Sequence, residues 1–454
     1  MSNVRNMTEG SPIKHILAFS LPILGGNLFQ QLYNVVDSVI VGRYVGTTGL
    51  AAIGAVNSIQ FLFFSVCMGL ASGIGIVVSQ SFGAGRSVKR SITNGAKIML
   101  AVGIMMSIIS FFLAKPALVL MGTPEHIMGD GVVYLRTVCI GLLATAAYNC
   151  AAEMLRALGD SKTPLYFLVG ASILNIILDL VFILVFHMGV FGAAFATVIS
   201  QAFSALGAIT YAVLKNPYFK LKKEDWQTEK LMMRKCVRLG VPIAFQYSLI
   251  AVSCIALQIV VNQFGAVVIA AYTVTNKVEN VISIPFTTLT TALAAYTGQN
   301  IGARKVERVR KGLKSGAVIM LVYTAIMSPM VFFGGSLIIQ LFVNDPEVIA
   351  FGAQAFRIVS LFYIPLGSIY VVRGVLNGTG DGTFAFMSGI MEMLGRICLA
   401  KPLTMIAGIG VWGIWLATSL TWLVTGLAGI IRYRMGKWVV PEKRETAETH
   451  QENK

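Results

Sequence analysis

Long apolar stretches recur along nearly the whole chain, with short polar segments between them. Each stretch has about the 20 residues that a helix needs to cross the hydrocarbon core of a bilayer. Their residues do not alternate in polarity, as membrane β-strands would. The pattern therefore predicts an all-α polytopic membrane protein with twelve spans, at residues 13–42, 51–78, 93–115, 131–156, 163–186, 190–214, 233–261, 268–295, 312–338, 350–377, 383–405 and 410–432.

The two halves of the chain resemble each other at an offset of about 220 residues. Gln80-Ser-Phe-Gly-Ala84 matches Gln299-Asn-Ile-Gly-Ala303, and basic residues follow both. Further pairs in the same order are Pro22 with Pro242, Arg136 with Arg357, Gly159-Asp160 with Gly380-Asp381, Val190-Phe-Gly192 with Val411-Trp-Gly413, and Ala196-Thr197 with Ala417-Thr418. Because each repeat has an even number of spans, both insert the same way up. We therefore expect two six-helix bundles related by a pseudo-two-fold axis along the membrane normal, a geometry that suits alternating access.

The polar segments suggest where the chain divides. We expect an N-terminal six-helix lobe at residues 1–214, a polar cytoplasmic linker at 215–232 and a C-terminal lobe at 233–440. Residues 441–454 are charged and follow a proline, which predicts a disordered cytoplasmic tail.

Composition supports a membrane protein, since 56% of the residues are hydrophobic and only 12% are charged, against about 25% in soluble domains. The net charge of +16 does not indicate nucleic acid. Basic residues concentrate in alternate loops, at 86–90, 156–162, 215–238, 304–314 and 432–437. This positive-inside bias places both termini in the cytoplasm.

The sequence contains no nucleotide-binding loop in a soluble segment, no metal-ligand cluster and no nucleophile triad. The six cysteines lack CxxC spacing and lie in or beside apolar runs, which is typical of core packing. We therefore expect no enzyme activity and no cofactor, and instead a secondary transporter that acts in the lipid bilayer.

Ionisable residues within spans are costly and are functional candidates. Asp37 lies in the first span, Asn175 and Asp179 lie one helical turn apart in the fifth, and Thr197 lies in the sixth. Counted from the ends of their spans, Asp37, Asp179 and Thr197 lie at one depth. Asn175 is one turn deeper and Tyr134 lies near the outer end of the fourth span, so we expect their oxygens to meet at one level. Two carboxylates in one apolar pocket must share a proton or bind a cation such as Na⁺ with the amide and hydroxyl oxygens. The alternative is that both aspartates only bond to neighbours and hold the helices together.

The C-terminal half carries a different set of charges. The positions that match Asn175 and Asp179 are Arg396 and Ala400. Lys277 and Glu279 lie in the eighth span, and Glu392 and Arg396 lie four residues apart in the eleventh. Two positive and two negative charges can cancel as a buried network, which either holds the fold together or contacts substrate and gates transport. Pro22 in the first span is a candidate hinge, because proline kinks membrane helices.

The chain is similar to members of the MATE (multidrug and toxic compound extrusion) family over nearly all of residues 10–435. The residues that carry this resemblance are the runs Gln30-Gln-Leu-Tyr-Asn-Val-Val-Asp37-Ser-Val-Ile-Val-Gly42, Leu155-Arg-Ala-Leu-Gly-Asp160 and Leu174-Asn-Ile-Ile-Leu-Asp179, with the paired Gln-x-x-Gly-Ala elements. The resemblance implies cation-coupled export of small, often cationic, drug-like compounds. It assigns ion binding to Asp37, Asn175, Asp179 and Thr197, and Tyr134, Gln30 and Asn34 join them as candidates to contact ion or substrate.

The NorM-like branch of the family has acidic residues in its seventh and tenth helices. This sequence has Gln246, Ser248 and Gln258 in the seventh and Arg373 in the tenth. The resemblance therefore favours a bacterial DinF-like or related branch. We expect a protein of the bacterial cytoplasmic membrane that is coupled to H⁺ or Na⁺ and works as a monomer. A lipid-linked oligosaccharide flippase of the same superfamily is the alternative, although such a protein should have a cationic cavity.

Overall fold

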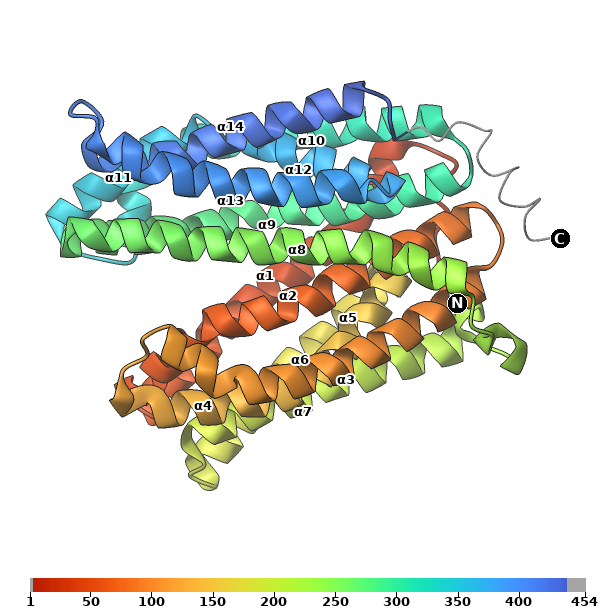
Figure 1. The fold of residues 1–454 in the computed structure, drawn as a ribbon, viewed down its shortest axis with the longest axis horizontal. Helices are drawn as coiled ribbons and strands as arrows, with labels where there is room; N and C mark the ends of the chain where they lie inside the picture. The colour runs from red at the N-terminus through yellow and green to blue at the C-terminus, as the bar shows by residue number, and fades with distance from the viewer. Residues whose placement is uncertain (1–2, 439–454) are drawn as a thin grey trace.

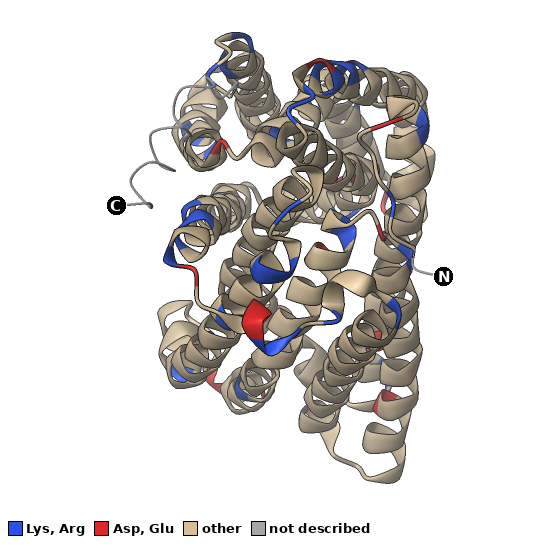
Figure 2. Ribbon diagram, turned by 90° about the vertical axis from the view of Figure 1, so that its right-hand side faces the viewer, with Lys and Arg blue, Asp and Glu red and all other residues tan. Residues whose placement is uncertain are grey.

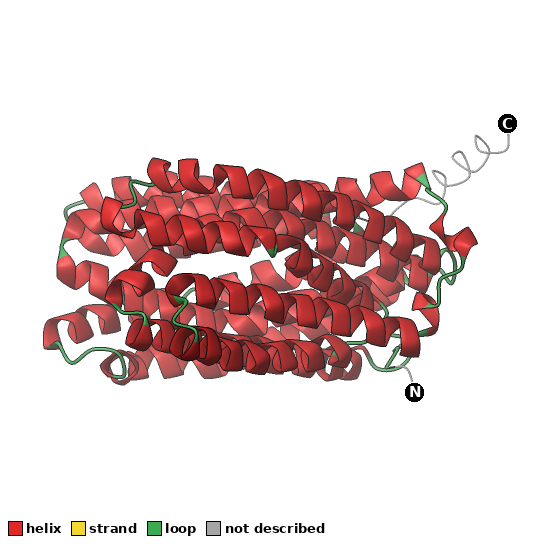
Figure 3. Cartoon of the chain, turned by 90° about the horizontal axis from the view of Figure 1, so that it is seen from below, coloured by secondary structure: helices red, strands yellow, loops and turns green. Residues whose placement is uncertain are grey.

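The structure is a computed structural model that describes residues 3–438. Within this range the chain forms helices joined by short loops and has no strand (Figure 3). The tail predicted at 441–454 lies outside the described residues.

Seven α-helices form the first half of the chain. Their bounds are α1 (Pro12–Tyr44), α2 (Thr47–Gly83), α3 (Val88–Leu120), α4 (Glu125–Ile140), α5 (Leu142–Ala157), α6 (Lys162–Leu180) and α7 (Gly189–Lys215). A single π-helical turn, η1 (Val181–Val185), continues α6 beyond its last residue. The linker holds two short 3₁₀ turns, η2 (Pro217–Phe219) and η3 (Lys223–Trp226).

Seven further α-helices form the second half. They are α8 (Lys230–Val261), α9 (Ala266–Gly302), α10 (Val306–Gln340), α11 (Pro346–Ser360), α12 (Tyr363–Thr379), α13 (Gly382–Met405) and α14 (Gly413–Arg434). The 3₁₀ turns η4 (Asn262–Phe264) and η5 (Gly410–Trp412) lie in loops.

These helices confirm the predicted layout of twelve spans in two bundles. Eight described helices are individually long and apolar enough to cross a bilayer, and two bent pairs raise that number to ten. α1 and α9 carry more polar residues and complete the twelve. The predicted spans 131–156 and 350–377 are broken, since α4 and α5 meet at 46° and α11 and α12 at 52°. Hydrophobic pattern does not reveal such bends, because the apolar run continues through them.

Each bundle has its own hydrophobic core. Figure 1 shows the two bundles as the orange-to-yellow and green-to-blue halves of the chain. The first core is built mainly on α2 to α5 and α7, and the second on α9 to α12 and α14. α1 belongs to both: Ile16 and Phe19 near its start pack in the second core, whereas Ile40 and Val41 near its end pack in the first. α1 therefore crosses from one bundle to the other.

The linker after α7 packs closely against α3. Thr93 Oγ1 donates to Asp225 O (2.6 Å), and Asn94 Oδ1 accepts from Glu229 N (3.0 Å). Lys89 Nζ donates to Lys220 O (2.8 Å). These bonds hold the polar linker on the end of the first bundle.

Both ends of the described chain lie at one end of the molecule (Figure 1). We call this the terminal end, and the opposite one the distal end. The two bundles lie closer together at the terminal end than at the distal end (Figure 1). Seen from the terminal end, Lys and Arg are prominent in the loops and helix ends (Figure 2).

Candidate functional site

The carboxyl groups of Asp37 and Asp179 meet inside the first bundle, within hydrogen-bonding reach of each other. Asp37 is on α1 and half-buried, and Asp179 is on α6 and fully buried. The π-helical turn η1 begins two residues after Asp179. η1 is therefore the last turn of this span, and Asp179 lies just before it.

Asn175 and Thr197 fix the orientation of Asp179. With its amide nitrogen facing Asp179, Asn175 donates to Asp179 Oδ2 (3.0 Å), and its oxygen accepts from Thr197 N (3.1 Å). The Thr197 hydroxyl donates to Ala193 O (3.0 Å) within α7. The bond from Asn175 holds the carboxyl group of Asp179 in place. A proton on either carboxyl group can then bridge Asp37 and Asp179.

Two tyrosines surround the carboxyl pair. Tyr134 on α4 is buried and faces Asp37 and Asp179. Tyr33, one turn before Asp37 on α1, lies close to both carboxyl groups and to Thr197. The structure thus brings together Asp37, Asn175, Asp179, Thr197 and Tyr134, the five residues that the sequence placed at one level, and adds Tyr33.

The depth of this cluster follows from helix lengths. Asp37 is seven residues from the end of α1, Asp179 six from the end of η1, and Thr197 eight from the start of α7. At about 1.5 Å per residue, all three lie roughly 9–12 Å from the distal ends of their helices.

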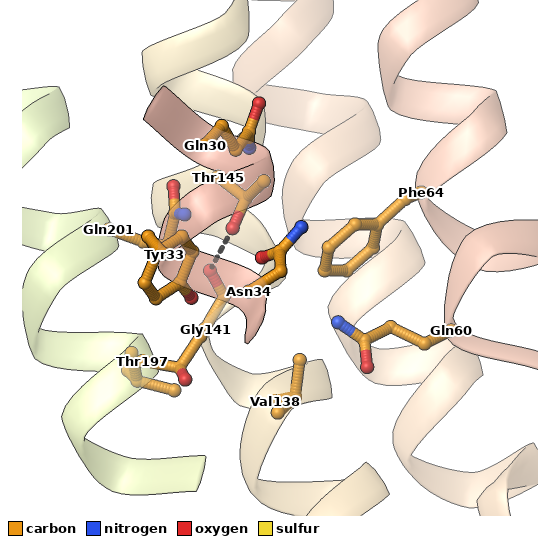
Figure 4. A pocket seen from close by; sticks show the side chains of 11 residues that line it. Gln30, Tyr33, Asn34, Gln60, Phe64, Val138, Gly141, Thr145, Thr197 and Gln201 are labelled. Atoms are coloured by element: carbon orange, nitrogen blue, oxygen red, sulfur yellow. Dashed lines mark hydrogen bonds between the residues drawn. The ribbon is translucent and has the colours of Figure 1, made fainter. Parts of the chain in front are cut away.

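A cavity of about 130 Å³ adjoins the cluster, and Tyr33 and Thr197 line both. Gln30 and Asn34, the other two candidates from α1, also line it. Figure 4 shows the side chains of Asn34 and Gln60 facing this space from α1 and α2. Its remaining lining residues are Phe64, Val138, Gly141, Thr145, Val198 and Gln201. The polar groups of this wall are amides and hydroxyls, which suit uncharged or cationic organic groups.

Sequence reasoning missed Tyr33, Gln60, Thr145 and Gln201. Gln60 and Gln201 are uncharged polar residues in the middle of apolar spans, and that alone was a signal. Tyr33 and Thr145 gave none, because tyrosine and threonine are common in membrane helices. Only the packing of α1, α2, α5 and α7 puts them on one cavity.

The charges of the C-terminal half are arranged differently from the expected four-residue network. Glu392 forms a buried ion pair with Arg373 on α12. Arg396 donates instead to Ser253 Oγ (2.8 Å) on α8 and faces Glu279. Lys277 is exposed and has no ion pair among the described residues. The buried network therefore contains Arg373 and not Lys277. Arg373 and Glu392 meet because α12 packs beside α13, which the sequence does not reveal.

Pro22 lies within α1, which continues without a break from Pro12 to Tyr44. Next to it is a gap of about 10 Å³ against α6, lined by Gly26, Leu165 and Leu168 among others. The gap is about the size of one water molecule.

The donor set at the carboxyl pair fits a small cation. Two carboxyl groups and one threonine hydroxyl supply oxygen atoms, and such hard ligands suit a proton or Na⁺. Asn175 instead presents its amide nitrogen to Asp179. Twelve spans in two bundles, with this pair beside a polar cavity, are the features of a membrane transporter.

The MatE family model matches residues 22–181 and 242–400, once in each half of the chain. The chain therefore belongs to the MATE family of membrane transporters. Because one model matches twice, over nearly equal lengths whose first residues are 220 positions apart, the two matches agree with the internal repeat.

Similar proteins cover almost the whole chain. The "Probable multidrug resistance protein YpnP" of Bacillus subtilis is 29% identical over 439 residues, which is 95% of this chain and 97% of that protein. The "Probable multidrug resistance protein NorM" of Thermotoga maritima is 23% identical, over 95% of this chain and 93% of its own. A solved structure of a multidrug resistance MATE transporter in an outward-facing conformation has a TM-score of 0.90 at 21% identity, covering 96% and 98% of the two chains. This last likeness establishes the fold.

Proposed function

We propose that this protein exports small organic compounds, cationic drugs among them, across the cytoplasmic membrane of a bacterium in exchange for an inward-moving cation. Membership of the MATE family and the names of the relatives support export of drug-like compounds. The protein works as a monomer, because each chain has its own carboxyl pair and its own cavity. Transport proceeds by alternating access of the two bundles.

The observation that carries this proposal is the contact between Asp37 and Asp179 beside the cavity. Two ionised carboxylates at this distance repel each other, so the pair favours binding a cation. A proton fits direct contact between the two carboxyl groups, and Na⁺ fits the same oxygens if they move apart. We therefore propose H⁺ as the coupling ion, with Na⁺ as the alternative that the experiment tests.

Coupling follows from electrostatics. Ionised Asp37 and Asp179 attract a cationic drug toward the adjoining cavity, and a bound proton removes that attraction. An ion drives release only by binding one state of the protein more tightly than the other. The exchange of drug for proton at one site therefore provides the coupling.

The position of the site favours entry of the ion from outside. The basic loops of the terminal end indicate that this end faces the cytoplasm. The carboxyl pair lies nearer the distal end, which then faces outward. The cavity, at about 130 Å³, is smaller than the roughly 300–1,000 Å³ of sites for drug-sized ligands. Loading a drug therefore requires the bundles or α1 to move.

The test is transport by purified protein in liposomes, with a proton gradient and a Na⁺ gradient imposed separately. We expect the proton gradient alone to drive movement of a cationic dye. Asp37→Asn should abolish this coupled movement, because an amide cannot release a proton, while the protein still inserts and folds.

A matched control is Asp130→Asn, which makes the same change at an exposed aspartate on α4. It should transport at the wild-type rate. Dye movement driven only by Na⁺ would replace H⁺ as the coupling ion. Wild-type coupling in the Asp37→Asn protein would remove the carboxyl pair from the mechanism.

A further inference from the structure

The segment before α1 runs across the terminal end and contacts both bundles. We call residues 3–10 the strap. On the first bundle, Arg5 N donates to Leu158 O (3.1 Å) beyond the end of α5. Asn3 Nδ2 lies 3.5 Å from Thr163 Oγ1 on α6. The strap therefore has two side-chain or backbone hydrogen bonds with the first bundle, and Val4 also packs against the first core.

The strap is held more firmly by the second bundle. Met7 N donates to Gln299 Oε1 (2.8 Å), and the Met7 side chain is fully buried in the second core. Arg308 donates to Met7 O (3.0 Å), Glu9 O (3.0 Å) and Gly10 O (2.9 Å). Lys305 Nζ donates to Thr8 O (3.0 Å). These contacts come from α9, α10 and the loop between them.

Gln299 is where the strap and both bundles meet. Besides accepting from Met7, its amide donates to Ala157 O (2.9 Å) at the end of α5. Its repeat mate Gln80 donates to Gly378 O (3.0 Å), which lies at the corresponding place in α12. The two glutamines thus tie the bundles together symmetrically, and the strap adds a third tie on one side only.

The length of the strap limits how the terminal end can open. Its anchors at Arg5 and Met7 are two residues apart, and two residues of extended chain span at most about 7 Å. The bundles therefore cannot move apart at this point while both anchors hold. The second bundle has the larger number of bonds and the buried methionine. Opening must then break the bonds to Leu158 and Thr163.

We propose that the strap is a conformational latch, which stabilises the state closed at the terminal end and leaves the first bundle each time that end opens. This inference rests on the alternating access proposed above. The latch sets the ratio of the two states, and thereby the rate at which the transporter returns to the cytoplasmic side.

The test measures the distance between the bundles by pulsed electron spin resonance. Spin labels replace Arg90 on α3 and Lys314 on α10, both exposed near the terminal end, in a background without the native cysteines. Arg5→Pro removes the N–H that bonds Leu158. We expect it to raise the ratio of long to short distances about fivefold, as loss of one hydrogen bond would. Arg5→Gln is its control, since it removes the same charge, keeps the N–H and should match the wild type.

A second pair of variants tests the other anchor if Arg5→Pro does not fold. Arg308→Gln removes the bonds to three strap carbonyls and should shift the ratio in the same direction. Arg310→Gln makes the same change two residues away, where the side chain pairs only with Glu307 among the described residues, and should leave the ratio unchanged.

Wild-type ratios in both Arg5→Pro and Arg308→Gln would overturn the latch while leaving alternating access intact. A single unchanging distance in the wild type, at every pH and with or without drug, would overturn alternating access and the latch with it.

Discussion

At the scale of single residues, glycines determine how closely the bundles approach each other at the terminal end. A Cβ on Gly83 of α2 would lie 1.9 Å from Gln299 O, and one on Gly302 of α9 would lie 2.0 Å from Gln80 O. Any side chain at either position would have to push the two helices apart. The repeated Gln-x-x-Gly-Ala elements therefore place a hydrogen-bonding amide and a close backbone contact on each side of the pseudo-two-fold axis.

We expect Gly83→Ala to lower the melting temperature of the purified protein by several degrees, because forced overpacking costs about 1–3 kcal/mol. Gly54→Ala is the matched control on the same helix, since a Cβ there meets nothing within 4 Å. It should keep or raise the melting temperature, as alanine favours helix more than glycine does. Equal melting temperatures for the two variants would contradict the close contact.

At the scale of elements, α1 connects the candidate site to the terminal end. It carries Asp37 toward its end, Pro22 in its first half and the strap before its start. Its two halves pack in different cores. Movement of the bundles against each other must therefore bend α1 or slide part of it. Pro22 lies between Phe19 and Ile23, near the end of the region packed in the second core and before α1 reaches the first core. We propose Pro22 as the hinge for this movement.

Pro22→Ala should restore the helical hydrogen bond to Ala18 O and stiffen α1. We expect export in liposomes to slow several-fold while drug binding to the purified protein stays close to wild type. Pro116→Ala in α3 is the control, because this proline also interrupts helical bonding but is exposed on the side of the bundle. Slowing by both variants to the same extent would mean that helix stiffness in general, and not a hinge at Pro22, limits export.

At the scale of the whole molecule, an even number of spans brings both described ends of the chain to one face. The helix order explains this directly, since six spans per half return the chain to the side where it began. The basic loops on that face favour the cytoplasm. The linker is bound to α3 on the same face by Thr93 and Asn94, so the two halves are joined by a packed connection.

This orientation is testable by labelling intact cells with a reagent that does not cross the membrane. In a background without native cysteines, single cysteines at Glu125 and Asp345, both in the distal loops or first turns, should react. A cysteine at Lys223 in the linker should react only after the cells are opened. Labelling at Lys223 in intact cells would reverse the proposed topology.

The sequence by itself determined the number and order of the spans, because a bilayer requires about 20 apolar residues per helix wherever the chain crosses. It also placed Asp37, Asp179 and Thr197 at one depth, with Asn175 one turn deeper, since depth depends only on the count of residues from a helix end. The internal repeat identified Gln80 and Gln299 as equivalent, although it did not reveal what they bind.

Tertiary structure alone decided which side chains meet. Glu392 pairs with Arg373 and not with Arg396, because partner choice depends on how α12 and α13 pack. Tyr33, Gln60 and Gln201 share one cavity because α1, α2 and α7 surround it. The bends at α4–α5 and α11–α12 and the strap across both bundles depend on contacts between residues far apart in the chain. Hydrophobic periodicity records which residues avoid water, and it carries no information on which of them touch.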